Sequence, residues 1–129
     1  MADELGALEH KLDIEILEQS VERVVGRMPV RGNTQPFGRL HGGATMALGE
    51  TLGSLAADLH AQATGRLAVG VDINGTHLTP ARTGNVIGTA VPLHLGRRIT
   101  THEVSVRDEE GRLVATIRIT NMLVEPAEE

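Results

Sequence analysis

The chain has 129 residues, of which 40% are hydrophobic and 22% are charged, and its formal net charge is −5. This length fits one folded domain over residues 1–129, because a chain of this size can bury about two-thirds of its unfolded surface in one core. The acidic balance argues against the basic face that nucleic-acid binding requires, without excluding local basic patches, and one Phe with no Trp or Tyr leaves no set of aromatic side chains for base stacking. We therefore expect no nucleic-acid partner.

Cysteine is absent, which excludes disulfides, thiolate nucleophiles and cysteine-bound metals. The N-terminus lacks a basic start followed by an apolar run, and no segment approaches the ~20 apolar residues of a membrane-spanning helix. We expect a cytoplasmic protein without a membrane partner.

The first third of the chain predicts a helix, two short strands and a loop. Apolar residues recur at helical spacing within residues 1–12, which predicts an N-terminal helix. Residues 12–16 alternate between apolar and acidic side chains, and residues 24–30 are again rich in β-forming residues; they predict two strands, or one bent strand. Two Gly, one Pro and one Asn predict a loop over residues 31–40.

Residues 41–63 predict a long central helix, because the segment is rich in Ala and Leu and contains no Pro. Its apolar residues occupy nearly all faces of the helix instead of one stripe. A helix with this pattern is expected to be buried on most of its surface.

The remainder of the chain predicts strands, at 67–73, 86–95, 99–107 and 113–124. The turn signals PARTGN, LGRR and DEEG separate them, as expected for antiparallel hairpins. An antiparallel sheet wrapped around the central helix would bury that helix, so the sequence predicts the α+β class.

Glu50 is the first candidate for a catalytic residue, because an ionised carboxylate on a buried helix is costly unless it is paired or used. Ser54 lies one turn later on the same face, and Thr51 and Asp58 flank the two. The ordinary alternative is that this polar stripe faces water.

The helix start, His41-Gly42-Gly43, is the second candidate. Unsatisfied backbone N–H groups and a partial positive charge collect at such a terminus, and they can stabilise an oxygen that becomes negative. Gly42 and Glu50 are about 12 Å apart along the helix axis, too far to reach one carbonyl carbon together. This predicts a dimer in which one copy supplies Gly42 and the other Glu50, although an ordinary Gly-Gly turn is the simpler alternative.

The run LHGGATMALGETLGSLAA and the downstream segments INGTHLTP and HLGRR resemble the hotdog-fold thioesterases. The similarity is to the phenylacetate-pathway and Arthrobacter-type 4-hydroxybenzoyl-CoA class, and the chain also resembles the enterobactin proofreading and 1,4-dihydroxy-2-naphthoyl-CoA thioesterases. It extends from about Leu12 to Val124, and the spacing of the HGG, Glu and Ser residues is its most specific part.

The resemblance implies a hotdog fold and assigns catalytic roles to five residues. Glu50 would be the nucleophile or the general base, and the Gly42 backbone N–H would polarise the thioester carbonyl. Ser54 would position the attacking water or the substrate. Gln35 and His41 would orient the thioester, although His41 can also simply support the loop.

The resemblance also implies substrate contacts at Gly43, Thr51 and His77, and CoA phosphate contacts at Arg97 and Arg98, since the guanidinium fork suits phosphate. An ordinary strand histidine and solvated turn charges are the alternatives for His77 and for the two arginines. The remaining histidines lack a metal-ligand spacing such as HExxH. We expect no catalytic metal and no cofactor.

The expected function is hydrolysis of an aroyl-CoA or medium acyl-CoA thioester by a homodimer with shared active sites, assembled into a homotetramer as the resemblance implies. The alternatives are a proofreading hydrolase of carrier-protein thioesters and a non-catalytic acyl-CoA-binding protein. A hydratase of the same fold would carry an HFP-type segment, which this chain lacks.

Overall fold

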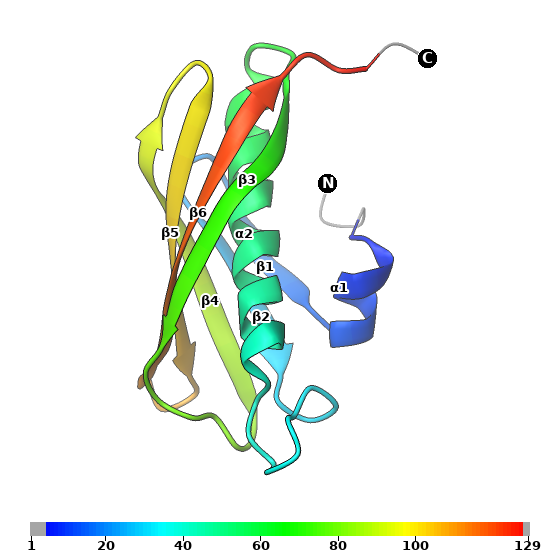
Figure 1. Cartoon of the computed structure of the whole chain (residues 1–129), viewed down its shortest axis with the longest axis vertical. Helices are drawn as coiled ribbons and strands as arrows, with labels where there is room; N and C mark the ends of the chain where they lie inside the picture. Colours follow the sequence, from blue (N-terminus) through cyan, green and yellow to red (C-terminus); the bar gives the residue numbers. More distant parts are fainter. Residues whose placement is uncertain (1–4, 128–129) are drawn as a thin grey trace.

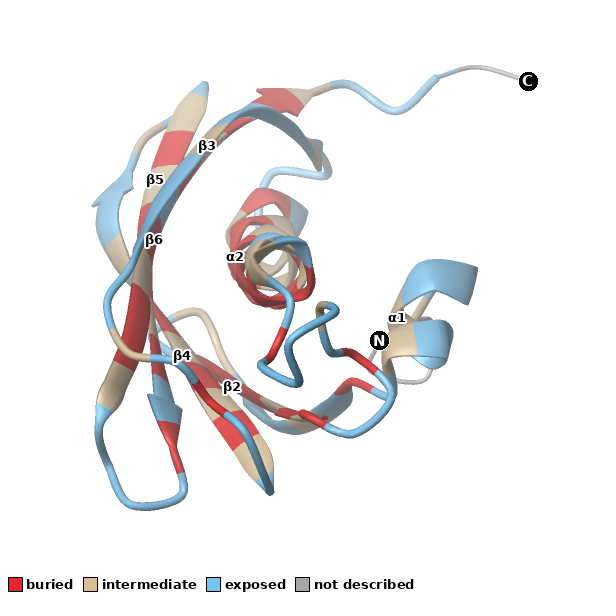
Figure 2. Cartoon of the chain, turned by 60° about the horizontal axis from the view of Figure 1, so that its bottom comes forward, coloured by how far each residue is buried: buried red, intermediate tan, exposed pale blue. Residues whose placement is uncertain are grey.

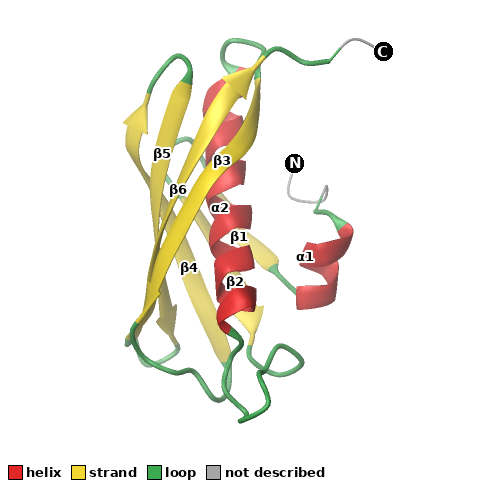
Figure 3. Cartoon of the chain, in the orientation of Figure 1, coloured by secondary structure: helices red, strands yellow, loops and turns green. Residues whose placement is uncertain are grey.

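The computed structural model describes residues 5–127 and contains a six-stranded sheet with two helices (Figure 1). In chain order the elements are α1 (Ala7–Leu12), β1 (Glu15–Gln19), β2 (Val24–Pro29), α2 (Gly42–Gln62), β3 (Leu67–His77), β4 (Asn85–Leu95), β5 (Ile99–Asp108) and β6 (Leu113–Val124). The strand order is β1-β2-β4-β5-β6-β3, and every neighbouring pair is antiparallel. The predicted α+β class and the hotdog arrangement are confirmed, with the sheet curved around α2 (Figure 3).

The core lies between α2 and the concave face of the sheet. Leu48, Leu52 and Ala56 are fully buried on the sheet-facing side of α2. A Cβ added at Gly53 would lie 2.2 Å from Ile119 Cγ2, so only glycine lets β6 approach the helix this closely at this position. Close packing of small helix residues against branched strand residues therefore fixes the depth of α2 in the sheet.

The opposite side of α2 is not covered by the sheet. Figure 2 shows buried residues on the sheet-facing side of α2 and mixed exposure on the side toward α1. The expectation that the helix is mostly buried is met for most of its residues, since ten of its 21 residues are buried and three are exposed. The exception is the side that the curved sheet leaves open and that the short α1 covers only in part. Glu50 is exposed on this uncovered side.

Three further expectations change at the element ends. β3 continues past residue 73 to His77, because its backbone pairs with β6 through the register His77 to Ala115. The Asn-Gly pair in this stretch is therefore part of a strand and not a turn. The first strand runs over Glu15–Gln19, and the N-terminal helix begins at Ala7 within the described residues, whereas residues 1–4 of the predicted helix lie outside them.

Neither helix in residues 5–127 is long and apolar enough to cross a membrane.

Candidate active site

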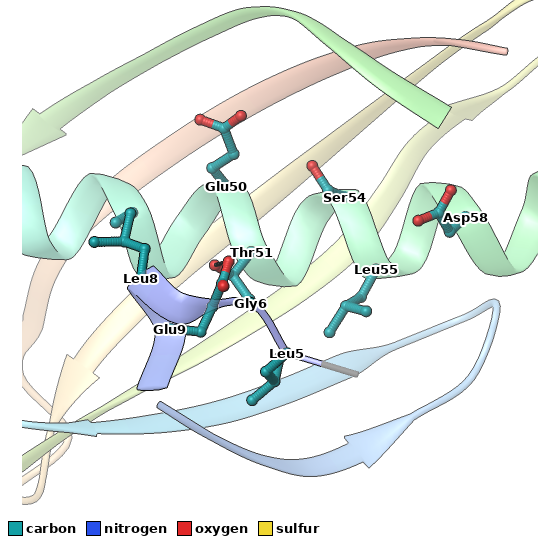
Figure 4. Close-up of a pocket in the computed structure, with 10 residues that line it drawn as sticks. Leu5, Gly6, Leu8, Glu9, Glu50, Thr51, Ser54, Leu55 and Asp58 are labelled. Atoms are coloured by element: carbon teal, nitrogen blue, oxygen red, sulfur yellow. Dashed lines mark hydrogen bonds between the residues drawn. The ribbon is translucent and has the colours of Figure 1, made fainter. Parts of the chain in front are cut away.

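Glu50 and Ser54 lie on the side of α2 that the sheet leaves uncovered, and they line a cavity of about 380 Å³ between α2 and the N-terminal segment. The lining combines polar and aliphatic side chains: Leu5, Gly6, Leu8, Glu9, Ala47, Glu50, Thr51, Ser54, Leu55 and Asp58. Figure 4 shows the Glu50 carboxylate and the Ser54 hydroxyl pointing to the same side of α2, away from Leu5 and Leu55. The cavity can therefore accept a partly apolar ligand beside two polar groups.

The Glu50 carboxylate also reaches the edge strand β3. Its Oε2 lies 3.3 Å from the position that a Cβ would take at Gly70, so the absence of a side chain there leaves room for the carboxylate. A second hollow of about 300 Å³ lies on this side of Glu50 and includes Val71 and Asp72. The carboxylate thus lies at the border of two hollows, accessible to a ligand from either one.

Two other polar residues on this side of α2 are engaged in structural hydrogen bonds. Thr51 Oγ1 donates to Glu9 Oε2 over 3.1 Å, which ties α1 to α2. Asp58 Oδ1 accepts a hydrogen bond from the backbone N–H of Ala68 over 2.9 Å, which holds the start of β3 against the helix. Thr51, predicted to contact substrate, lines the same cavity but has its hydroxyl proton directed to Glu9.

The start of α2 leaves one backbone donor free. His41 is the N-cap residue, and its Nδ1 accepts a hydrogen bond from the Gly43 N–H over 2.8 Å. The Gly42 N–H donates to no group within residues 5–127. Gly42 therefore presents the available donor at this terminus, while the N–H of Gly43, predicted to bind substrate, is used by the cap.

Gln35 and His77 are brought together around Gly42, in a separate cavity of about 350 Å³. A Cβ at Gly42 would lie 3.1 Å from His77 Nε2, so the ring packs directly against the helix start. Gln35 Oε1 accepts hydrogen bonds from the backbone N–H groups of Phe37 and Arg39, which shapes the loop ahead of α2. The side-chain amide nitrogen of Gln35 is left as a donor at this cavity.

The predicted catalytic residues thus form two groups in one chain. Gln35 and Gly42 line one cavity and Glu50 and Ser54 line the other, and the two cavities share no residue. Two turns of α2, about 12 Å, separate the groups. No single carbonyl carbon can be reached by both within one copy.

Arg97 and Arg98 lie in neither cavity. They occupy the turn between β4 and β5, where both are exposed. Their backbone carbonyls are bonded, to Arg66 Nη1 over 3.0 Å and to the Leu123 N–H over 2.8 Å, so the turn is fixed while both side chains face solvent. Arg66 adds a third positive charge beside this turn.

Sequence reasoning did not find a buried polar group behind Ser54. Asn121 on β6 is fully buried, and its Nδ2 donates to Ser54 Oγ over 3.4 Å. Thr100 and His102 on the neighbouring strand β5 are also fully buried, and they pair with Asn121 and Ile119 of β6. The signal was present, because Asn121 interrupts an otherwise apolar series of alternating positions on β6.

Burial, together with the nearby charge of His60, lowers the pKa of His102 to about 4. His102 is therefore neutral near pH 7. Among the described residues, no three His, Asp or Glu side chains lie close enough together to hold a metal ion.

Comparison with known proteins places this fold and site in one family. The family model described as "Thioesterase superfamily" matches residues 37–115, which include Gly42, Glu50 and Ser54 but not Gln35. The chain therefore belongs to the thioesterase superfamily, and it is an enzyme of the thioester-hydrolase class.

Individual relatives agree with this assignment. The chain is 43% identical over 120 residues to the proofreading thioesterase EntH of Klebsiella pneumoniae, covering 92% of this chain and 82% of that protein. It superimposes on the crystal structure of a thioesterase from Haemophilus influenzae with a TM-score of 0.89 at 39% identity, covering 96% of this chain and 87% of the other. The E. coli PaaI protein from the phenylacetic acid degradation operon shares the fold, with a TM-score of 0.87 at 21% identity, over 97% of this chain and 89% of PaaI.

Proposed function

We propose that this enzyme hydrolyses an aroyl-CoA or medium acyl-CoA thioester to the free acid and CoA, with Glu50 as nucleophile or general base. The observation that carries the proposal is the pairing of one free backbone donor, at Gly42, with one exposed carboxylate, at Glu50, on the same helix. A thioester hydrolase needs both: a donor for the carbonyl oxygen and a base or nucleophile for the carbonyl carbon.

A second copy of the chain brings the two groups together. β3 is the last strand of the sheet, and its outer edge beside Glu50 exposes Leu67, Val69 and Val71 by 48%, 44% and 53%. An open edge with apolar side chains favours pairing with another chain. A twofold axis there runs the two α2 helices antiparallel, so that Glu50 of one copy faces Gly42 of the other. We propose a homodimer with two shared sites, two of which form a homotetramer.

In this arrangement the Gly42 N–H donates to the thioester carbonyl oxygen and stabilises the negative charge that develops there. Glu50 of the other copy either attacks the carbonyl carbon itself or takes a proton from the attacking water. The carbon–sulfur bond then breaks, and the departing CoA thiolate leaves as the thiol after taking up a proton. In the water route the free acid is the direct product. In the nucleophilic route the acyl group is left on Glu50 as an anhydride, which water hydrolyses to the free acid, and this restores the carboxylate. Both routes need the same carboxylate in the same place.

The remaining residues support binding. Gln35 and His77, beside Gly42, would hold the thioester group, and His41 fixes the helix start through its cap. The aliphatic wall formed by Leu8 and Leu55 would take the acyl or aroyl group. Arg97 and Arg98 would meet the CoA phosphates, since both guanidinium groups are exposed. The absence of cysteine supports a cytoplasmic location.

The test is release of free thiol from a panel of aroyl-CoA, acyl-CoA and acyl-carrier-protein thioesters. Glu50→Ala should lower kcat by roughly 10²–10⁴ on the preferred thioester, because the base or nucleophile is lost. The variant should stay folded, since Glu50 is exposed. Glu103→Ala, which removes an exposed glutamate from β5, is the matched control and should keep full turnover.

Each arm of the panel has a distinct meaning. Turnover of CoA thioesters that Glu50→Ala abolishes supports the proposal. Turnover restricted to carrier-protein thioesters moves the function to proofreading of carrier-bound acyl groups, the alternative that the resemblance implies. Turnover that Glu50→Ala leaves unchanged contradicts the role of Glu50.

A further inference from the structure

We propose that Asn121 is a positioning residue of this active site, which orients the Ser54 hydroxyl from behind the helix. The inference rests on the proposed function and adds a residue on β6 to it. Asn121 is fully buried on the sheet face that packs against α2. Its neighbours on that face, Ile117, Ile119 and Leu123, are apolar and buried.

The contact between Asn121 and Ser54 determines which way the hydroxyl can point. Asn121 Nδ2 donates to Ser54 Oγ over 3.4 Å, a long hydrogen bond of the kind that tightens when substrate closes a site. A serine hydroxyl has one proton and lone pairs that accept. A lone pair occupied from the sheet side leaves the proton to donate on the cavity side, and Ser54 makes no other side-chain hydrogen bond within residues 5–127.

The same amide also lies close to the Glu50 carboxylate. The point where a Cβ would stand at Gly70 is 3.3 Å from Glu50 Oε2 and 3.9 Å from Asn121 Nδ2. Glu50 and Ser54 are one helical turn apart and point to the same side of α2 (Figure 4). Asn121 therefore contacts the Ser54 hydroxyl directly, and it borders the same gap at Gly70 as the Glu50 carboxylate.

Polar groups in this part of the core reduce stability, which argues that they serve the site. Thr100 lies directly opposite Asn121 in the β5–β6 register. Thr100 Oγ1, both ring nitrogens of His102 and Asn121 Oδ1 are buried without a hydrogen-bond partner in the described chain. Burying such a group without a partner is unfavourable, and apolar side chains would avoid that cost.

His102 does not add a positive charge behind the site. Burial and the charge of His60 lower the pKa of His102 to about 4, so its ring is neutral at the pH of the cytoplasm. The buried polar residues behind Ser54, which are Thr100, His102 and Asn121, therefore act through fixed dipoles and not through a charge. A neutral amide that donates to Ser54 fits that environment.

A double-mutant cycle tests the proposal, with Asn121→Val, Ser54→Ala and the double variant assayed by thiol release. Valine suits a strand and has no hydrogen-bonding group. Asn121→Val should lower kcat about tenfold per folded protein and change KM by less than about twofold, because only the orientation of the hydroxyl in the transition state is lost. In the Ser54→Ala background Asn121→Val should have no further effect on kcat.

Thr120→Val is the matched control. Thr120 is the preceding residue of β6, faces the other side of the sheet, and hydrogen bonds to Thr101 over 3.1 Å. It loses one side-chain hydrogen bond as Asn121→Val does, but it should keep the wild-type kcat. If Asn121→Val does not fold, Asn121→Ala takes its place in the cycle.

Wild-type kcat in Asn121→Val, or a loss that multiplies with that of Ser54→Ala, overturns the proposal. A loss that matches only the fraction of folded protein, measured by circular dichroism, also overturns it. These outcomes differ from failure of the proposed function, in which the wild type releases thiol from no thioester. Turnover that Glu50→Ala abolishes and Asn121→Val leaves unchanged defeats the positioning role alone.

Discussion

The two sides of helix α2 carry different kinds of residue. The side toward the sheet carries Leu48, Leu52 and Ala56, all fully buried, and glycines that let β6 approach. The other side carries Glu50 and Ser54, which face the cavity beneath the N-terminal segment. One helix therefore supplies both part of the packing core and the proposed catalytic groups.

We call the side of α2 toward the sheet the packed side and the side with Glu50 and Ser54 the chemical side. Residues of the chemical side can be substituted without loss of packing, except where they contact residues of the packed side. Asn121 breaks that separation, because it is buried in the packed side and contacts Ser54 on the chemical side. Substitutions on the chemical side should change turnover with little effect on stability. Substitutions on the packed side should change stability first.

The largest effect in the following tests is expected at the helix start. Gly42→Pro removes the one free backbone N–H at the first helical position, where proline is well tolerated and its ring matches the helical φ. We expect kcat to fall by roughly 10²–10³, the typical effect of losing one oxyanion donor, with the helical circular dichroism unchanged. Thiol release measures the first result and the spectrum the second.

Gly42→Ala is the matched control for this prediction. It adds a Cβ near His77 Nε2, as proline does, but it keeps the N–H. An equal loss of kcat in both variants would show that the added carbon, and not the missing donor, is responsible.

A smaller effect is expected when the pH is lowered, because buried His102 on β5 should make the free energy of unfolding depend on pH. The pKa of His102 is lowered to about 4 in the folded state by burial and by the charge of His60. In the unfolded chain it returns to about 6.5, so the unfolded state binds the proton more readily between these values. The free energy of unfolding should therefore fall as the pH is lowered from 6.5 to 4, by at most about 3 kcal/mol from this residue.

Urea unfolding across that pH range measures this dependence. His102→Leu should remove the decline, whereas His10→Leu, at an exposed position on α1, should leave it in place. If the free energy of unfolding of His102→Leu falls as much as that of the wild type, other groups cause the fall and the role given to His102 is contradicted.

The smallest of these effects is expected from a single carbon atom at the contact of α2 with β6. Gly53→Ala places a Cβ 2.2 Å from Ile119 Cγ2, so the helix or the strand must move. We expect a loss of about 1–3 kcal/mol in the free energy of unfolding, as for other overpacked cores. Gln62→Ala, on an exposed position of the same helix, should change it by less than about 0.5 kcal/mol. A stabilised Gly53→Ala would contradict the packing described for this side.

The sequence predicted the elements that depend on local pattern. The long helix follows from its Ala and Leu content, and the hairpins follow from the turn signals between alternating segments. The extension of β3 to His77 could not be predicted, because it depends on pairing with β6, and Asn-Gly in that stretch is locally typical of a turn.

The candidate site was predictable in its parts but not in its spatial grouping. The resemblance named Glu50 and Gly42, and the rise of the helix put them too far apart for one copy. The exposure of Glu50 agrees with the alternative that the polar stripe faces water. The sequence could not decide between the two readings, because an apolar pattern around a helix does not say which side a single curved sheet covers. Asn121 was missed because its importance comes from a contact 67 positions away in the chain.

The central claim is that each active site is shared between two copies of the chain, and mixing two inactive variants tests it most directly. Gly42→Pro and Glu50→Ala would be co-expressed with different affinity tags, and the mixed dimer would be isolated by two purification steps. In the mixed dimer one site carries both substitutions and the other carries neither. We expect it to regain about half of the wild-type kcat per dimer, whereas either variant alone stays inactive. A mixed dimer as inactive as its parents would show that each site is built within one chain, and would contradict the shared site.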